Sequence, residues 1–344
     1  LDQKLLRRFD GVDRETVKAL LGDFYRNKYA PYEYDFSLIS KHALSRIYEH
    51  YVSLLSLEED KSPQAALFPR LPEAEKNKSY GSVYTPQFIA RFFARYLREQ
   101  LPPASFRRVQ TTDPACGSGI FLRSLLEVQC DPIGNGLTTD RIQSLFQNVT
   151  GIDIDKNACH ATRLSLSLLH MVLTDRLPLE LKVIVTEAID YYLSHPEMKE
   201  SCDAIVANPP FIALTTQSLR MRERVAKFMG KYASGRIDSY LPFLLIGLES
   251  LRPGGYAFFV LPHSFLLSTS AKEMRKLISE TTWIRCLADL SAIRVFDNTG
   301  SYVVLLIFQK KPNTGQLPPP TTVVECRDLV GRALQDAVDG RRII

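Results

Sequence analysis

The sequence contains no Cys-x-x-Cys pair and no cluster of cysteine with histidine. Its six cysteines lie far apart and are Cys116, Cys130, Cys159, Cys202, Cys286 and Cys326. This spacing argues against a zinc site and against a disulfide framework, and it is typical of proteins from a reducing compartment. We therefore expect a cytoplasmic protein that binds no metal.

Long apolar runs are also missing. No stretch of about 18 apolar residues is present, which argues against a membrane span and a membrane partner. The N-terminal stretch is charged and lacks the apolar core of a signal peptide. What is present is ordinary for a globular protein, with 45% hydrophobic and 24% charged residues. The net charge of +5 permits a nucleic-acid partner but does not require one.

The chain divides into three regions. Residues 1–78 carry apolar residues at helical spacing and are expected to form an N-terminal helical region. From 79 to 312, short apolar runs alternate with amphipathic segments, which is typical of a sheet covered by helices on both faces. We expect an α/β fold with a doubly wound, mostly parallel sheet of seven strands. Residues 313–344 begin with a proline-rich segment and are expected to be a linker.

The expected strands end at Thr112, at Ile154, near Thr186 and at Ala207, span Tyr256–Leu261, and lie near Ile284–Leu287 and Tyr302–Gln309. Helices are expected near 87–99, 119–129, 156–173, 240–251 and 270–280. The chain has no internal repeats.

Two of these strands end in acidic residues that suit a nucleoside-like ligand. Asp113 opens the turn Asp-Pro-Ala-Cys-Gly-Ser-Gly, whose glycines let the backbone approach a ligand closely. The turn has no third glycine in dinucleotide spacing, and an acid at the strand end favours a cationic ligand over a phosphate. Asp153, at the tip of the next strand, could accept hydrogen bonds from both ribose hydroxyls. A plain strand-to-helix turn is the alternative for the glycines, and Asp155 is better placed than Asp153 to cap the following helix.

The most specific feature is Asn208-Pro209-Pro210-Phe211, directly after an expected strand. The two prolines stiffen the loop and lack N–H groups, so nearby carbonyls stay available. The Asn208 side-chain oxygen and the Pro209 carbonyl can both accept hydrogen bonds from one amino group. This drives the nitrogen toward sp³ geometry and frees its lone pair for attack on a methyl sulfonium. Phe211 offers a flat face on which a base can stack. A proline-rich turn is the alternative.

Together these features resemble the gamma-class amino-methyltransferases, the adenine-N6 DNA methyltransferases of type I and type IIG restriction–modification systems. Four motifs occur in that family's order: Tyr84-Thr85-Pro86, Asp113 to Gly119, Gly151 to Asp155, and Asn208 to Phe211. The resemblance implies that 79–312 is a class I methyltransferase domain with a Rossmann-like sheet. It further implies methyl transfer from S-adenosylmethionine to a flipped adenine in double-stranded DNA.

The resemblance assigns roles to residues. Catalysis falls to Asn208, Pro209, Pro210 and Phe211. The residues expected at the cofactor are Tyr84, Thr85, Pro86, Asp113, Ala115, Cys116, Gly117, Asp153, Ile154, Asp190 and Asn208. Asp113 would meet the cofactor amino group, and Ile154 would pack on its adenine ring. Asp190 would accept from the adenine amine, with an ordinary surface aspartate as the alternative.

The segment Tyr84-Thr85-Pro86 precedes an expected helix. Thr85 suits the N-cap position and Pro86 the first helical position, so the positive helix end could face the cofactor carboxylate.

A basic stretch follows the Asn208 loop and contains only one acid, Glu223. Its basic residues are Arg220, Arg222, Arg224, Lys227, Lys231 and Arg236. Contact with DNA phosphates is one interpretation and a solvated helix face is the other.

The expected mechanism is an in-line displacement without a covalent enzyme intermediate, since no Pro-Cys dipeptide offers a nucleophile for carbon methylation. A duplex base must be flipped out, at a cost of a few kcal/mol. The alternatives are methylation of a protein glutamine or of a ribosomal RNA guanine, a cytosine-N4 amine, or a non-catalytic DNA-binding subunit. Members of this family carry a target-recognition domain, so 313–344 is expected to lead to such a domain, or to a specificity subunit, outside this chain. No nuclease constellation is visible in residues 1–78.

Overall fold

The computed structural model describes residues 85–130, 137–211, 219–233, 237–292, 302–315 and 317–326. The expected helical region 1–78, Tyr84 and Arg236 therefore lie outside the described residues. No helix in the described ranges is long and apolar enough to cross a membrane.

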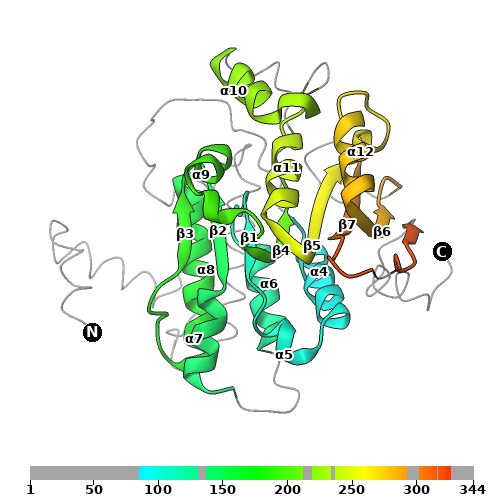
Figure 1. Ribbon diagram of the computed structural model, residues 1–344. Helices are drawn as coiled ribbons and strands as arrows, with labels where there is room; N and C mark the ends of the chain where they lie inside the picture. Colours follow the sequence, from blue (N-terminus) through cyan, green and yellow to red (C-terminus); the bar gives the residue numbers. More distant parts are fainter. Residues whose placement is uncertain are drawn as a thin grey trace, which may run out of the picture. The chain divides into compact units, whose positions relative to one another are not determined.

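The described residues form one eight-stranded sheet in the order β3-β2-β1-β4-β5-β7-β6-β8 (Figure 1). The strands are β1 Thr111–Asp113, β2 Val149–Asp153, β3 Lys182–Val185, β4 Cys202–Ala207, β5 Leu251–Pro262, β6 Thr282–Asp289, β7 Val303–Lys310 and β8 Thr322–Glu325. The first five are parallel to one another, and β7 runs antiparallel between β5 and β6. The mostly parallel α/β sheet predicted from the sequence is confirmed.

All seven expected strands are present, and β8 is an addition to them. It pairs in parallel with β6, from Cys286↔Thr322 to Asp289↔Glu325. The region 313–344, expected to be a linker, thus contributes the edge strand next to β6. The β-branched run Thr-Thr-Val-Val makes this short segment suited to pairing.

Helices cover both faces of the sheet (Figure 1). They are α4 Gln87–Gln100, α5 Pro103–Phe106, α6 Ile120–Gln129, α7 Thr139–Gln147, α8 Lys156–Thr174, α9 Ala188–Ser194, α10 Leu219–Met229, α11 Leu241–Ser250 and α12 Lys272–Thr281, with short 3₁₀ turns η3 Pro196–Met198, η5 Gly230–Tyr232 and η6 His263–Leu266. One buried cluster joins α4, α6, α7 and α8 to the sheet, and a second joins α9, α10, α11 and α12. This two-sided covering is the predicted doubly wound arrangement.

Strand β5 shows why both faces must be covered. Its successive side chains alternate between the two clusters, so Phe258 and Val260 enter the first while Phe259 and Leu261 enter the second. All four are fully buried. A strand that is apolar on both faces is stable only when helices cover each face.

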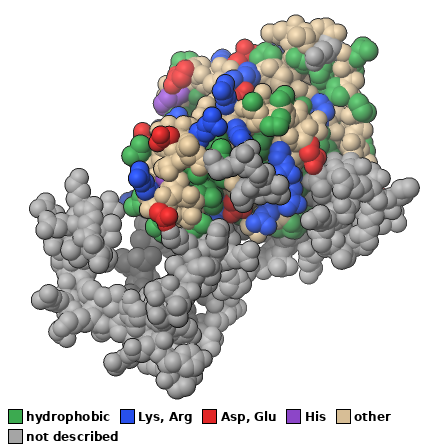
Figure 2. Space-filling view, turned by 90° about the horizontal axis from the view of Figure 1, so that it is seen from below, with side chains coloured by type: hydrophobic (Ala, Val, Ile, Leu, Met, Phe, Trp, Pro, Cys, Tyr) green, Lys and Arg blue, Asp and Glu red, His purple; other side chains and the backbone are tan. Residues whose placement is uncertain are grey.

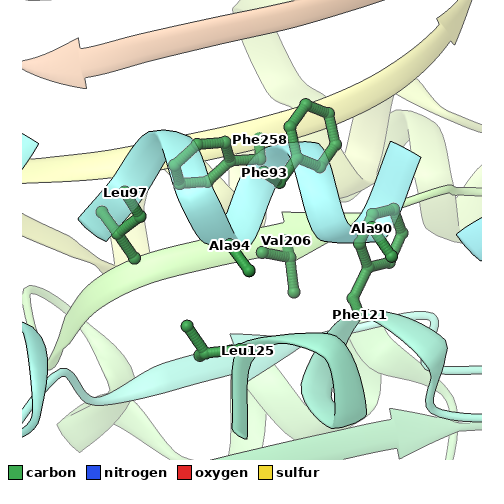
Figure 3. Close-up of a pocket in the computed structure, with 8 residues that line it drawn as sticks. All are labelled: Ala90, Phe93, Ala94, Leu97, Phe121, Leu125, Val206 and Phe258. Carbon is green, nitrogen blue, oxygen red and sulfur yellow. The ribbon is translucent and has the colours of Figure 1, made fainter. Parts of the chain in front are cut away.

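Helix α4 packs tightly on the first face of the sheet. Phe93 lies 5.6 Å from the Phe121 ring of α6 and 5.1 Å from the Phe258 ring of β5, measured between centroids. With their neighbours these side chains line a small apolar pocket between α4, α6 and the sheet (Figure 3). The packing of Phe93 holds the middle of α4 against α6 and the sheet.

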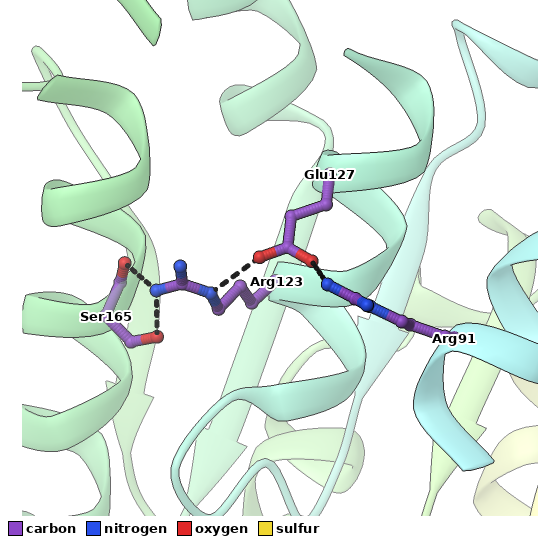
Figure 4. A network of polar contacts seen from close by, with 4 residues as sticks. All are labelled: Arg91, Arg123, Glu127 and Ser165. Carbon is purple, nitrogen blue, oxygen red and sulfur yellow. Dashed lines mark hydrogen bonds and ion pairs between the residues drawn. The ribbon is translucent and has the colours of Figure 1, made fainter. Parts of the chain in front are cut away.

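A buried arginine connects the helices of the same face. Arg123 of α6 donates through Nε to Glu127 Oε1 at 2.9 Å and through Nη1 to the backbone oxygen of Ser165 in α8 at 3.2 Å. Arg91 of α4 reaches Glu127 Oε2 at 3.3 Å (Figure 4). Because Arg123 is only 4% exposed, its charge must be satisfied by such partners, and the network ties three helices together.

Candidate functional site

The carboxyl ends of four neighbouring parallel strands meet at one edge of the sheet. In the order β3-β2-β1-β4, the chain runs outward in one direction from β1 and in the other direction from β4. In open α/β sheets, ligands bind outside the carboxyl ends of the strands, at the point where the winding reverses. Asp113, Asp153 and Asn208 each stand at or directly after such an end. The topology therefore brings together the motifs predicted from the sequence.

The glycine turn after β1 is bonded to the tip of β2. The Gly117 N–H donates to Asp153 Oδ2 at 2.9 Å, and the Cys116 N–H donates to the Ile152 carbonyl at 2.9 Å. Asp153 Oδ1 also accepts from the Asp155 N–H at 2.9 Å. Each carboxylate oxygen keeps a second lone pair, so Asp153 can still accept from a ligand hydroxyl. Burial raises the pKa of Asp153, and the N–H bonds from Asp155 and Gly117 oppose that rise.

Asp155 and Cys116 have structural roles beside this turn. The Asp155 side chain accepts from the Asn157 N–H at 2.8 Å and caps α8, as the sequence predicted in preference to Asp153. Cys116 is a buried residue, 4% exposed, and belongs to the first core cluster. The buried Cys116 side chain cannot reach a ligand, so this residue can contact a cofactor only through its backbone.

Asp113 is the most deeply buried acid of the edge, with no exposed surface. Its Oδ1 accepts from the Ala115 N–H at 3.0 Å, and its Oδ2 has no hydrogen-bond partner among the described residues. Burial raises the pKa of Asp113 well above its usual range, and the nearby Asp153 charge adds to the rise. A buried carboxylate oxygen of this kind fits a cationic amino group, because such a group would supply the missing charge and donor together.

An apolar platform lies beside these acids. Ile154, the residue directly after β2, has a side chain that is largely open to solvent, at 68% exposure. Strand β3 pairs with β2 up to Asp153↔Val185, and α9 starts three residues later with Asp190 in its first turn. Asp153 and Asp190 thus follow neighbouring parallel strands at the same edge of the sheet as Ile154.

The Asn208 loop is held from two directions. Asn208 Nδ2 donates to Thr85 Oγ1 at 3.0 Å, and Ser239 Oγ donates to the Pro210 carbonyl. Pro209 is buried, while Phe211 is half-buried and packs against the first core cluster. Because Nδ2 is engaged by Thr85, the amide presents Oδ1 as the side-chain atom that can accept from an amine.

The predicted N-cap of the helix at this edge is wrong by one residue. Pro86, not Thr85, holds the N-cap position of α4, and no side chain caps that helix. Its ψ of 140° keeps Pro86 extended, so Thr85 stands one residue too early to cap. The Thr85 hydroxyl accepts from the Asn208 side-chain amide instead.

Thr162 of α8 is a supporting residue that the sequence did not reveal. It is fully buried, and its Oγ1 donates to the Gly117 carbonyl at 2.7 Å. A Cβ built on Gly119 would lie 2.8 Å from Thr162 Cγ2. A threonine in the middle of a helix carries no sequence signal for this contact.

Replacing Gly119 with alanine is expected to destabilise the turn more than replacing Gly117. Both residues have positive φ, +79° and +52°, which costs an alanine about 1–2 kcal/mol. Only Gly119 would add a clash, since a Cβ on Gly117 meets nothing within 4 Å. Chemical denaturation of both variants measures the difference. Equal losses of unfolding free energy would show that Thr162 yields to the new methyl group.

The basic residues after the loop do not share one environment. Arg220, Arg222, Lys227 and Lys231 are exposed, whereas Arg224 is half-buried and paired with acids of α9. Arg224 therefore differs from both interpretations of the basic stretch, phosphate contact and a solvated helix face, because acids of α9 bind it.

Basic side chains also occur away from this edge. Figure 2 views the molecule from the side of α5 and α7, and Lys and Arg side chains are scattered there among acids. Arg107 and Arg108, just before β1, are exposed at this amino-terminal edge of the strand. Basic charge alone does not distinguish the two edges.

Comparison with known proteins identifies the kind of enzyme that the chain resembles. The family described as Eco57I restriction-modification methylase matches residues 147–296. The Type II methyltransferase M.BstVI of Geobacillus stearothermophilus is 25% identical over 244 residues, which cover 68% of this chain and 43% of that protein. The Type II restriction enzyme and methyltransferase RM.Eco57I of Escherichia coli is 29% identical over 111 residues, 32% of this chain and 11% of that protein. The matches thus span less than half the length of each relative.

Among solved structures, a candidate class I S-adenosylmethionine-dependent methyltransferase from Listeria monocytogenes matches with a TM-score of 0.60 at 15% identity. The match covers 90% of this chain and 80% of that one. These findings confirm the resemblance predicted from the four motifs: the chain is similar to the methyltransferases of restriction–modification systems and has the fold of class I S-adenosylmethionine-dependent methyltransferases.

Proposed function

We propose that this protein transfers the methyl group of S-adenosylmethionine to the N6 amine of an adenine flipped out of double-stranded DNA, within a restriction–modification or related phage-defence system. The observation that carries the proposal is the fixed Asn208 amide at the end of β4. With Nδ2 donating to Thr85, Oδ1 is the atom offered to an incoming amine.

The residues of the edge fit the cofactor. The ionised Asp113 would accept from its amino group through Oδ2, Asp153 would accept from its ribose, and Ile154 would pack on its adenine ring. Asp190 would accept from the adenine amine. When bound, S-adenosylmethionine supplies an activated methyl group on a sulfonium. The chain's own task is to align a nitrogen lone pair with that methyl group.

Asn208 and Pro209 would perform this alignment. The amine of adenine is conjugated with its ring, so its lone pair is a poor nucleophile. Hydrogen bonds from its two N–H groups to Asn208 Oδ1 and the Pro209 carbonyl hold the nitrogen in place and favour sp³ geometry. The amine would exchange one N–H proton, released to solvent, for the methyl group that the bound cofactor supplies. Phe211 would stack on the flipped base and offset part of the cost of unstacking it.

Exposed basic residues support DNA as the substrate. Arg220, Arg222, Lys227 and Lys231 lie on α10 and η5, which follow the catalytic loop in the chain. Phosphate contacts of this kind position a duplex without reading its sequence. Sequence choice would come from a target-recognition domain or a specificity subunit.

The test is a methyl-transfer assay with isotopically labelled cofactor. The protein is incubated separately with long DNA from a methylation-deficient bacterium, with total RNA and with a protein extract. Long heterogeneous DNA contains most short recognition sequences, so the assay works whichever sequence the enzyme targets. The label is expected in N6-methyladenine after digestion to nucleosides. Label in N4-methylcytosine would correct the base, and label only in protein glutamine or in RNA guanine would refute DNA as the substrate.

A further inference from the structure

Arg224 differs from the other basic residues of its helix. Helix α10 is anchored by the buried Val225 and Met229, which enter the second core cluster. This anchoring turns Arg224 toward α9, where its side chain is 32% exposed. Figure 1 places α9 and α10 on the same side of the sheet, above the strand ends.

The guanidinium of Arg224 joins two acids. Its Nη2 contacts Glu187 Oε2 and lies 2.8 Å from Asp190 Oδ1. Glu187 Oε2 also accepts from the Asp190 N–H at 3.0 Å and so caps α9. One nitrogen of α10 therefore fixes both the cap of α9 and the side chain of its third residue.

The contact between Arg224 and Asp190 is expected to add little to the stability of the fold. The Asp190 side chain is 56% exposed, and ion pairs at such exposure contribute little to stability. An aspartate that is this exposed would otherwise rotate freely in water. Arg224 restricts that rotation by binding one oxygen, Oδ1, and the carboxylate has a second oxygen, Oδ2, for another donor.

The charge of Arg224 also compensates the charges of Glu187 and Asp190. Glu187 and Asp190 stand one helical turn apart, so their negative charges repel each other. Burial raises the pKa of Glu187, and the positive charge of Arg224 opposes that rise. Arg224 thus supplies positive charge to both acids through one nitrogen.

We infer that Arg224 is a positioning residue of the cofactor site, which holds Asp190 so that Oδ2 meets the exocyclic amine of an adenine nucleoside lying over Ile154. The inference rests on the proposed function for the identity of that nucleoside. It assigns Arg224 to cofactor selection and leaves phosphate contact to the exposed basic residues of α10 and η5.

The experiment uses two stable product analogues, S-adenosylhomocysteine and S-inosylhomocysteine, which differ at the purine amine. Their dissociation constants are measured by calorimetry for the full chain and for Arg224→Gln. The unmodified protein is expected to prefer the adenosyl compound by about tenfold or more, the effect of a hydrogen bond to a charged acceptor. In Arg224→Gln the adenosyl compound should bind about five- to tenfold more weakly, with less than a twofold change for the inosyl compound. A defect of folding alone would weaken both compounds equally.

Two matched variants complete the design. Arg222→Gln removes an equal charge from the exposed face of the same helix and should leave the preference between the compounds unchanged while weakening DNA binding. Arg224→Gln combined with Asp190→Asn should be no worse than Asp190→Asn alone. If Arg224→Gln weakens DNA binding and keeps the full preference for the adenosyl compound, Arg224 is a phosphate contact and the inference is wrong. If the unmodified protein binds neither compound, the proposed function fails first and the inference fails with it.

Discussion

Replacing Asn208 with alanine is expected to lower the rate of methyl transfer by at least about 100-fold while the affinity for the cofactor changes less than about twofold. The loss follows from removing one fixed hydrogen-bond partner of the reacting nitrogen, an effect that reaches this size in preorganised sites. Cofactor affinity is spared because the acids of β1 and β2, not Asn208, would carry most of its contacts. Single-turnover rates and calorimetry measure the two quantities separately.

The contact with Thr85 provides a finer control for this prediction. Thr85→Val removes the acceptor of Asn208 Nδ2 at nearly constant volume, so the amide loses its fixed orientation. The single-turnover rate should fall about fivefold, in line with about 1 kcal/mol for one hydrogen bond, and Thr85→Ser should restore it. Asp153→Ala, unlike Asn208→Ala, should weaken the binding of the cofactor. If Asn208→Ala and Asp153→Ala both lost the cofactor equally, the division of roles between these residues would be mistaken.

The sheet and the placing of the motifs could be predicted from the sequence because both follow from local patterns. The apolar runs of β4, β5 and β7 have the length and composition of buried strands. Once β1, β2 and β4 lie parallel in one sheet, their carboxyl ends share an edge, so Asp113, Asp153 and Asn208 must lie at that edge. No contact between side chains is needed for that conclusion.

The contacts that complete the site could not be predicted, because they join residues far apart in the chain. Thr85 and Asn208 are separated by 123 positions, and Thr162 and Gly117 by 45. A local rule assigned Thr85 to a helix cap, and the tertiary contact with Asn208 replaced that role. Arg224 likewise looked like one basic residue among several until the packing of α10 turned it toward Asp190. Strand β8 has only four residues, and it is a strand because it pairs with β6, which the local sequence does not reveal.

Replacing Asp113 with asparagine is expected to have opposite effects on stability and on cofactor binding. In the unfolded chain this acid titrates near its usual pKa of about 3.9, and in the folded chain burial raises the pKa well above that range. The folded state therefore binds more protons between the two values, and its stability falls as pH rises through that interval. The full penalty is present above the raised pKa, where the folded protein must hold a buried carboxylate.

The Asp113→Asn side chain would not titrate, so this penalty would vanish. Its amide oxygen can keep the hydrogen bond from the Ala115 N–H, and a buried neutral amide costs less than a buried charge. The melting temperature of the cofactor-free variant should thus exceed that of the unmodified protein at pH 8, and the two should converge as pH falls. The Asp153 carboxyl remains in both proteins, so its own titration largely cancels in the comparison. Thermal unfolding between pH 5 and 9 provides the measurement.

Cofactor binding should change in the other direction. The proposed partner of Asp113 Oδ2 is a cationic amino group, and losing a hydrogen bond between charged groups costs about 1.5–3 kcal/mol, or roughly 10- to 150-fold in affinity. Affinity of the unmodified protein should also rise with pH through the raised pKa of Asp113, because the ammonium favours the ionised carboxylate. The Asp113→Asn substitution should abolish that pH dependence. A variant that is both more stable and equally able to bind S-adenosylhomocysteine would show that Asp113 is buried for another reason. Greater stability with lost affinity would mean that the folded chain tolerates an unfavourable charge at β1 because the cofactor compensates it.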